Sequence, residues 1–420
     1  FHMATNLLVS NQGGLLKTIW SQKDIYEMVC KSCPFLGMVP KDTSTHQLYW
    51  RTTVGYGLSQ GLGSTYATAR SNRAPSVQAE FQLTAKPYYG SAVIDGRVVR
   101  RAKHDVAFVL DTVKRESTNL LMQAQKDFST YLQGNAGGAI AQVSSVNSNT
   151  ITLTYGHDLK NFSVGMTCTA STADGTSGSE RSGTMVVTSI GTYDSPTVTF
   201  GTIVAGTAAA DYIFRYGTFG ATITGLASWL PTHSGSPAAL GGVTRTTNPF
   251  ALAGVSINGA SCTSVKQAVL LLARYMADTT GPTPGGQTVF MGTILWESLA
   301  NELQANNSGF RMSKVPAAKV GSISIGVEYD AIELVGPLGN MKVVASPYIP
   351  DGIIRILTLD RIKLKTSGPL FQWVDGAKIE NGQLKMENDD DAYEIRLISD
   401  GELDCGEAPG FHGVIYNVVA

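Results

Sequence analysis

The sequence predicts an α+β protein with more than one domain, and three regions of the chain indicate this. A long amphipathic helix is expected over residues 102–133, followed by short alternating strands over 139–220. Residues 221–345 then alternate between helical and strand patterns. Because 420 residues exceed the size of one ordinary hydrophobic core, we expect these regions to form separate domains.

The composition suits a β-rich protein whose surface is largely covered by neighbouring molecules. Hydrophobic residues make up 43% of the chain and charged residues only 15%, alongside 45 Gly. The net charge of -1 argues against a free-standing DNA-binding protein, because such proteins neutralise phosphates with a strongly basic surface. The five scattered Cys do not form a disulfide scaffold and fit reduced thiols of cytoplasmic origin.

The chain shows no sign of membrane insertion or export. No apolar run approaches the roughly 20 residues of a membrane span. The start of the sequence lacks the basic and apolar regions of a signal peptide. Met3 is expected to be the natural start, with Phe1 and His2 as added residues.

A long β-hairpin is predicted over residues 47–87, after an N-terminal segment with a helical pattern at 23–33. Residues 46–54 and 76–83 alternate between polar and apolar positions, as strands do. The Gly-rich connection between them is too long for a tight turn. This predicts two strands joined by an extended, Gly-rich tip.

The charges of the predicted hairpin are all positive. From Thr43 to Ala79 the charged residues are Arg51, Arg70 and Arg73. We expect these cations to have no internal partner, and two interpretations stay open. The arginines are either solvated on a mobile loop, or they meet carboxylates on another subunit, which a planar guanidinium binds bidentately.

The helix over 102–133 is the strongest single element of the sequence. Its apolar positions recur at spacings of three and four and form one stripe: Val106, Leu110, Val113, Leu120, Leu121, Ala124, Phe128 and Leu132. About 30 residues give a rod roughly 45 Å long, which needs an extended sheet to lie on. Gly134 is placed to end the helix in a left-handed cap.

Cations gather near the start of this helix, where they oppose the helix dipole. They are Arg97, Arg100, Arg101 and Lys103. They form either an exposed basic turn or a set of contacts to carboxylates, across an interface between subunits.

Residues 139–220 predict a small all-β module, inserted after the helix and bounded by Gly at both ends. Its strands are expected at 151–154, 184–188, 197–200 and 211–214. Further along, Ser264 is expected to cap a helix, 287–291 to form a buried strand, and Thr293 to cap a helix through Leu303. Strands are expected at 341–349, 353–364 and 393–398.

Patterns that could indicate catalysis are weak. Cys30 and Cys33 have zinc or redox spacing, but no second Cys pair completes four ligands, which favours structural thiols. Residues 55–61 resemble a dinucleotide loop, but they lie between two strands, which favours a hairpin tip. The six His are dispersed and no P-loop occurs, so the sequence indicates no enzyme, cofactor or metal site.

An acidic run near the end of the chain contains Glu387, Asp389, Asp390 and Asp391. It lacks the Gly and the terminal Glu of an EF-hand loop, which argues against calcium binding. Two interpretations stay open: a solvated acidic turn, or a surface that faces the arginines of a neighbouring hairpin.

The last residues predict a strand, a turn at Pro409–Gly410 and a short apolar strand that reaches Val418. Chain ends usually fray, but this end is rich in β-branched residues. We therefore expect it to be paired within a sheet.

The order of these elements resembles the tailed-phage major capsid proteins of the Hong Kong 97 fold. Residues 123–135 resemble the end of that family's spine helix, and 225–231 resemble the start of its axial domain. Residues 401–418 resemble its closing segment.

The resemblance implies a division of the chain into the parts of that fold. These are an N-terminal arm (1–46), an extended loop over an adjacent subunit (47–87), a peripheral domain with the spine helix (88–138), an inserted β domain (139–220), an axial domain (221–345), peripheral return strands (346–398) and axial C-terminal strands (399–420). The inserted domain is expected on the outer surface.

The resemblance further implies a structural protein rather than an enzyme. Its function would be self-assembly into hexamers and pentamers of an icosahedral shell, which encloses double-stranded DNA without sequence-specific binding. Portal and scaffolding proteins are the expected partners, the host cytoplasm is the expected site of assembly, and the virion is the expected location. The contacts between subunits are assigned to Arg51, Arg70, Arg73, Arg97, Arg100, Arg101, Glu387, Asp389, Asp390 and Asp391.

Two departures from the family pattern carry their own expectations. Residues 43–79 hold no Lys, so we expect no covalent crosslink from the extended loop. No long helical scaffold region precedes the hairpin, so scaffolding is assigned to another protein or to a segment already removed. Alternatives are an encapsulin-like nanocompartment shell, which shares the fold, and a β-rich phage tail or adhesin protein.

Overall fold

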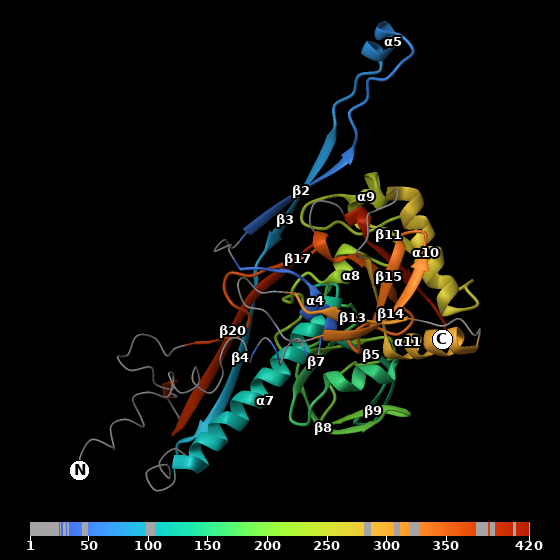
Figure 1. Cartoon of the computed structure of the whole chain (residues 1–420). Coiled ribbons are helices and arrows are strands. Elements are labelled where there is room, and N and C mark those ends of the chain that lie inside the picture. The colour runs from blue at the N-terminus through green and yellow to red at the C-terminus, as the bar shows by residue number, and fades with distance from the viewer. Residues whose placement is uncertain are drawn as a thin grey trace.

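The computed structural model describes residues 25, 27, 31, 33–43, 49–97, 106–280, 287–305, 311–318, 328–374, 385–386, 391–405 and 409–419. These residues form a projecting hairpin, a mixed sheet with a long helix, a closed barrel and a second, seven-stranded sheet (Figure 1). The α+β class predicted from the sequence is confirmed.

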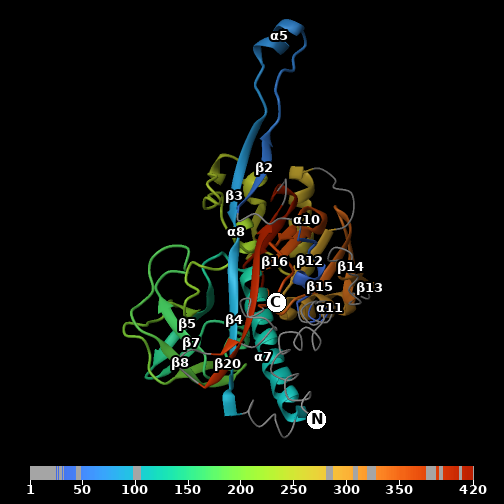
Figure 2. The same ribbon diagram turned by 90° about the vertical axis from the view of Figure 1, so that its left-hand side faces the viewer.

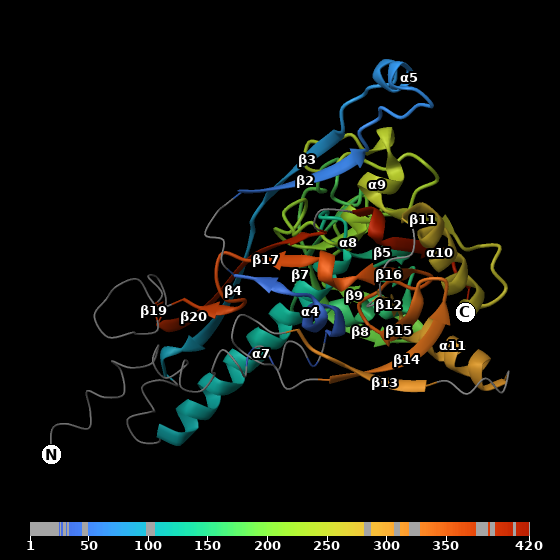
Figure 3. The same ribbon diagram turned by 45° about the horizontal axis from the view of Figure 1, so that its top comes forward.

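The hairpin consists of β2 (Tyr49–Gly57) and β3 (Val77–Thr84), close to the two strands predicted from the alternating pattern. Its tip contains a short helix, α5 (Tyr66–Ser71), which the sequence did not predict. The backbone N–H of Thr68 donates to Thr65 Oγ1 at 3.2 Å, so a threonine caps this helix. Figure 3 shows the hairpin leading away from the rest of the chain, with α5 at its far end.

The long helix α7 (Val106–Gln133) confirms the predicted spine over the described residues and is about 42 Å long. It lies on the antiparallel pair of β4 (Lys86–Asp95) and β20 (Ala392–Asp404). The other strands of this sheet are β1 (Lys41–Asp42), β17 (Lys363–Lys365), β18 (Gln372–Trp373) and β19 (Lys385–Met386).

The helix α7 ends differently from the prediction. The backbone N–H of Gly134 donates to the carbonyl of Tyr131 at 3.0 Å, and Gly134 is not among the residues with positive φ. The left-handed conformation is adopted two residues later, by Ala136 at a φ of 69°. The expected left-handed cap at Gly134 is therefore wrong, because the last turn tightens before the chain reverses.

Residues 139–215 include a closed six-stranded barrel with the order β10-β5-β6-β9-β8-β7. Its strands are β5 (Ala139–Asn147), β6 (Thr150–Leu153), β7 (Thr167–Ser171), β8 (Met185–Thr192), β9 (Ser195–Phe200) and β10 (Tyr212–Arg215). A short 3-10 helix, η1 (Gly156–Asn161), follows β6. Closure leaves no unpaired strand edge along this path.

The seven-stranded sheet has the order β11-β21-β16-β12-β15-β14-β13. Its strands are β11 (Val255–Asn258), β12 (Gln287–Met291), β13 (Arg311–Pro316), β14 (Glu328–Gly336), β15 (Gly339–Ala345), β16 (Ile354–Thr358) and β21 (Gly413–Tyr416). The last strand, β21, lies between β11 and β16, which confirms that the end of the chain is tied into a sheet.

The helices α10 (Val265–Thr280) and α11 (Thr293–Ala305) accompany this sheet. The backbone N–H of Gln267 donates to Ser264 Oγ at 3.1 Å, so the predicted N-cap is confirmed. The short helices are α4 (Pro34–Met38), α8 (Leu226–Trp229), α9 (Pro249–Ala253), η2 (Arg245–Thr247), η3 (Leu359–Arg361) and η4 (Pro409–Phe411).

The return strands do not follow the boundaries drawn from the sequence. The segment 346–398 was assigned to one peripheral unit, but β16 lies inside the seven-stranded sheet, and β20 runs continuously across position 398. Every residue of β16 is buried, which suits a central strand that is covered on both faces. Figure 2 shows the barrel on one side of the β4–β20 pair and the seven-stranded sheet on the other.

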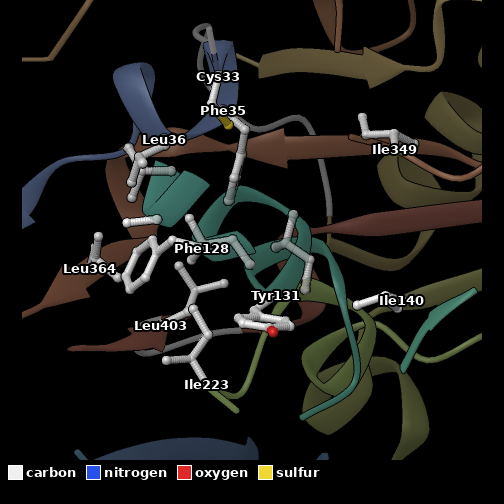
Figure 4. Packing of buried hydrophobic residues seen from close by; sticks show 14 of the residues in the cluster. Cys33, Phe35, Leu36, Phe128, Tyr131, Ile140, Ile223, Ile349, Leu364 and Leu403 are labelled. Carbon is white, nitrogen blue, oxygen red and sulfur yellow. The ribbon is translucent and has the colours of Figure 1, made fainter. Parts of the chain in front are cut away.

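An apolar core joins these parts where the C-terminal half of α7 meets α4 and the strands of the mixed sheet (Figure 4). The ring of Phe128 packs edge-on against Phe371, with centroids 5.4 Å apart. Cys33 is fully buried and forms no disulfide, in agreement with the interpretation of structural thiols, whereas Cys30 lies outside the described residues.

Candidate subunit-contact surface

The base of the hairpin is part of the protein's own core. Trp50, Val54, Phe81 and Leu83 point inward from alternate positions of β2 and β3 and are buried. The ring of Phe81 lies 5.1 Å from the ring of the fully buried Trp229. The indole N–H of Trp229 donates to the carbonyl of Leu403 at 2.8 Å, which ties this contact to β20.

Hydrogen bonds fix the direction in which the hairpin leaves the core. The hydroxyl of Thr52 donates to Asp404 Oδ2 at 2.9 Å. The backbone N–H of Gln82 donates to the carbonyl of Gly241 at 3.0 Å. Gly241 has a φ of +54°, and a Cβ there would meet backbone atoms of Gln82 at 2.9 Å, so this close approach requires glycine.

The far end of the hairpin exposes large apolar side chains. Leu58 is 87% exposed, Leu62 88% and Tyr66 89%; we name these three residues the apolar tip. The tip is nevertheless folded, since the side chain of Asn72 donates to the carbonyl of Leu62 at 3.0 Å. An ordered segment that holds such side chains in water has the character of a binding surface.

Arg70 and Arg73 accompany the apolar tip. Arg70 lies in the last turn of α5, Arg73 follows two residues after the helix, and both are exposed. Within the described part of the chain, neither guanidinium has a carboxylate partner. Both interpretations of these two arginines therefore stay open: they are either solvated or meet carboxylates on another subunit.

Arg51 corrects the expectation that the hairpin lacks internal partners. Its guanidinium lies 3.1 Å from the carboxylate of Glu80, and the two side chains are 68% and 45% exposed. The strand register places Thr53 opposite Glu80, so Arg51 is the diagonal neighbour of Glu80 on the same face. The segment 43–79, in which all charged residues are arginines, ends one residue before Glu80.

Two further assigned residues, Arg97 and Asp391, lie at the other end of the molecule. Arg97 follows β4, and its backbone N–H donates to Asp95 Oδ1 at 2.7 Å. The carbonyl of Asp391, just before β20, accepts from the backbone N–H of Gly96 at 2.7 Å. The structure thus places Arg97 and Asp391 near each other, at the end of the β4–β20 pair that points away from α5 (Figure 1).

Five of the assigned residues, Arg100, Arg101, Glu387, Asp389 and Asp390, lie outside the described residues.

A polar groove of about 900 Å³ lies at the base of the hairpin, where β2 faces the segment from η3 to β17. It is lined by four cations and two carboxylates: Arg51, Arg361, Lys363, Lys365, Asp360 and Asp404. Lys365 pairs with Asp404 at 2.6 Å, and Arg361 lies 4.0 Å from the centre of the Phe411 ring. The groove therefore has an excess of positive charge and suits an acidic segment.

Sequence reasoning missed this groove. Lys363 and Lys365 flank the buried Leu364, which is the pattern of a strand with one charged face, so a local signal was present. Nothing local placed that face against β2, which is more than 300 positions earlier in the chain.

Two features are absent from the described residues. No group of three or more His, Cys, Asp or Glu among them is arranged to hold a metal ion. None of the helices in that part of the chain combines the length and the apolar character of a membrane span.

Comparison with solved structures identifies the fold. The capsid asymmetric unit of cyanophage A-1(L) matches over 93% of each chain, with a TM-score of 0.50 and 12% identity. The native GTA particle capsid matches over 91% of this chain and 89% of its own (TM-score 0.43, 9% identity). The capsid of the Myoviridae phage XM1 matches over 91% and 90% (TM-score 0.42, 7% identity).

No protein-family model matches the sequence, and no curated protein matches it either. At 12% identity, the similarity to the cyanophage structure concerns the fold. The mixed α+β architecture of the described residues fits the Hong Kong 97-type capsid fold that the sequence resembles. The chain therefore has the fold of a phage capsid protein.

Proposed function

We propose that this chain is the major capsid protein of a tailed double-stranded DNA virus and assembles into the hexamers and pentamers of an icosahedral shell. The observation that carries the proposal is the hairpin: its base belongs to the core, while its ordered apolar tip is exposed at the far end. The capsid fold, matched over nearly the whole chain, supports it.

The tip supplies most of the contact energy in this proposal. Burial of one large apolar side chain contributes about 1.5–3 kcal/mol, whereas an exposed ion pair contributes at most about 1 kcal/mol. Leu58, Leu62 and Tyr66 therefore stabilise each contact, and Arg70 and Arg73 orient it. Repeated around a closed shell, contacts of this size hold the assembly together and still allow subunits to exchange during assembly.

Carboxylates of a neighbouring copy are the proposed partners of the arginines. Arg70 and Arg73 lie at one end of the molecule, and Asp391 at the other end, so the two groups meet only between copies. The acidic residues Glu387, Asp389, Asp390 and Asp391 face the hairpin of a neighbour in this arrangement. The basic residues Arg97, Arg100 and Arg101 form further contacts between subunits.

The remaining assignments follow from the same proposal. Residues 47–87 act as the extended loop over an adjacent subunit, and the barrel lies on the outer surface of the shell. The shell encloses double-stranded DNA without reading its sequence. It assembles in the bacterial host cytoplasm, with separate portal and scaffolding proteins.

Reversal of the tip charges tests the proposal. We expect the double variant Arg70→Glu, Arg73→Glu to lose shells in negative-stain electron microscopy and to sediment as small species. Its free energy of unfolding should equal that of the wild type within about 0.5 kcal/mol, because both side chains are exposed. The matched control Arg70→Lys, Arg73→Lys keeps the charge and should form shells at reduced yield, because lysine cannot bind a carboxylate bidentately.

Normal shells from the charge-reversed variant would contradict the role of the arginines. A wild-type protein that stays monomeric at high concentration, or forms only trimers, would overturn the shell itself and favour a tail or adhesin protein. Wild-type shells that enclose a protein cargo and no nucleic acid would favour the nanocompartment.

A further inference from the structure

Among the polar contacts that connect the barrel to the rest of the described chain, two clusters contain ion pairs. In the first, Arg215 of β10 pairs with the buried Asp127 of α7. Asp127 also accepts from the hydroxyl of Tyr88 at 3.0 Å and from the side-chain amide of Gln123 at 2.8 Å. A guanidinium stays charged throughout the accessible pH range, so the cation of this cluster is permanent.

The second cluster is centred on His157, in η1 of the barrel. Its Nδ1 lies 2.8 Å from Asp351 Oδ2, and its Nε2 lies 3.1 Å from Asp158 Oδ1. Asp351 belongs to the connection between β15 and β16 of the seven-stranded sheet, whereas Asp158 belongs to η1 itself. One imidazole thus joins a carboxylate of the sheet to a carboxylate of the barrel.

The two contacts together require a protonated ring. A neutral imidazole has one N–H and can donate to one carboxylate, whereas an imidazolium has two and can donate to both. The side chain of His157 is only 13% exposed, so water cannot freely replace a lost partner. When the ring loses a proton, one of the two carboxylates loses its donor.

Other charged and titratable groups surround the ring. Lys160, also in η1, donates to the carbonyl of Pro347 and lies 5.1 Å from the centre of the Tyr348 ring. The ring of Tyr155 lies 5.5 Å from that of His157. A cavity of about 210 Å³ at this junction is lined by Tyr155, Tyr212, Tyr348, His157, Asp158 and Lys160. Burial and the charge of Asp351 raise the pKa of Tyr193, which lies in the turn between β8 and β9.

The direction of the titration follows from these neighbours. Burial by itself would lower the pKa of His157, but the hydrogen bond to Asp158 and the charges of Asp158 and Asp351 outweigh it and raise the pKa above its ordinary value. The stabilisation is therefore complete below pH ~6.5 and is lost as the pH rises through the raised value.

The titration of Lys160 has the opposite sign. Burial lowers the pKa of Lys160 to about 8, against the attraction of Asp158 and Asp351. The folded state therefore disfavours the protonated amine, and loss of this proton above pH 8 favours the docked state.

We propose that His157, Asp158 and Asp351 form a proton-dependent clamp, which holds the barrel against the seven-stranded sheet and loosens it as the pH rises. Both connections to the barrel contain a glycine in the left-handed region, Gly138 at a φ of 85° and Gly217 at 82°. The backbone N–H of Gly220 donates to the carbonyl of Gly137 at 2.9 Å and keeps the two connections together. The clamp is a property of one chain and does not depend on the proposed shell function.

Hydrogen–deuterium exchange of the full-length protein between pH 6 and pH 9 tests the clamp, with rates corrected for intrinsic exchange and compared in one assembly state. In the wild type, we expect corrected exchange in residues 156–161 and 346–353 to rise about tenfold, the effect of losing one charge-assisted hydrogen bond. In His157→Gln the same segments should exchange rapidly at every pH, without this rise.

Two matched variants distinguish the contribution of Asp351 from that of Lys160. Asp351→Asn keeps the ring and Asp158 but weakens the link to the sheet, so its exchange at pH 6 should resemble that of the wild type at pH 9. Lys160→Met should keep the rise, because His157 and both carboxylates remain. The strand β12 (Gln287–Met291) serves as an internal reference, and its exchange should not change.

A flat wild-type profile, or a rise that persists in His157→Gln, would overturn the clamp. So would a rise that disappears in Lys160→Met, since the rise would then depend on the lysine and not only on His157 and the two carboxylates. Parallel changes in β12 would show that the whole chain loosens and would refute a local device.

Discussion

The hairpin and the barrel both extend from the same body, but they differ in where their side chains find partners. The barrel closes on itself and is held by side chains of α7 and of the β15–β16 connection. The hairpin is buried only at its base, and its tip holds Leu58, Leu62 and Tyr66 in solvent. An extension with internal partners is complete in one chain, whereas an ordered extension with exposed apolar side chains has the character of a binding surface.

The base and the tip of the hairpin should respond differently to truncation, and this is the largest effect we expect. Trp229→Ala removes a fully buried indole that packs on Phe81 and donates to Leu403, and should lower the free energy of unfolding by about 3–5 kcal/mol. Chemical denaturation measures this loss.

The control for this experiment is Tyr66→Ala, at a position that is 89% exposed. It should change the free energy of unfolding by less than about 0.5 kcal/mol and act only on assembly. A large loss of stability in Tyr66→Ala would show that the tip also belongs to the core of its own chain, and the comparison would fail.

Removal of the barrel should have a smaller effect on the remainder of the protein. Gly137 and Gly220 are hydrogen-bonded to each other, so a short Gly linker can replace residues 139–220. The deletion removes Arg215, the partner of Asp127. We expect cooperative unfolding with a loss below the about 3–5 kcal/mol of an unpaired buried charge, because water reaches Asp127 once the barrel is gone.

Circular dichroism and chemical denaturation check the deletion. The variant Asp127→Asn in the shortened chain should recover part of the loss, since it removes the unpaired charge. A shortened chain without any cooperative unfolding transition would show that the barrel is an inseparable part of the core. The barrel could then not be described, like the hairpin, as an extension of a separate body.

A small effect is expected at Arg51, which has an internal partner in the hairpin. Arg51→Gln should change the free energy of unfolding by less than about 1 kcal/mol, because the pair with Glu80 is exposed. A double-mutant cycle with Glu80→Gln measures the coupling between the two side chains. A coupling well above 1 kcal/mol would mean that this pair helps to fix the hairpin, which we otherwise attribute to the contact between Trp229 and Phe81 and to the hydrogen bonds of Thr52 and Gln82.

Much of the fold could be predicted from local patterns. The stripe of apolar residues over 102–133 predicted α7, and the alternation at 46–54 and 76–83 predicted β2 and β3. The helix α5 was not predicted, because Tyr66–Ser71 is too short to show a periodic stripe. For the candidate surface, the sequence indicated Arg70 and Arg73 but not the apolar tip, since exposure depends on what else packs there.

What the sequence determined by itself is the longer elements and the burial of the last strand, because periods of 2 and 3.6 residues are local properties of the chain. Only the tertiary structure decided which elements meet. The register of β2 and β3 gave Arg51 a partner, β16 joined the seven-stranded sheet, and His157 met a carboxylate 194 positions away. Such contacts depend on how faces pack and on where hydrogen bonds are satisfied, and no local pattern carries that information.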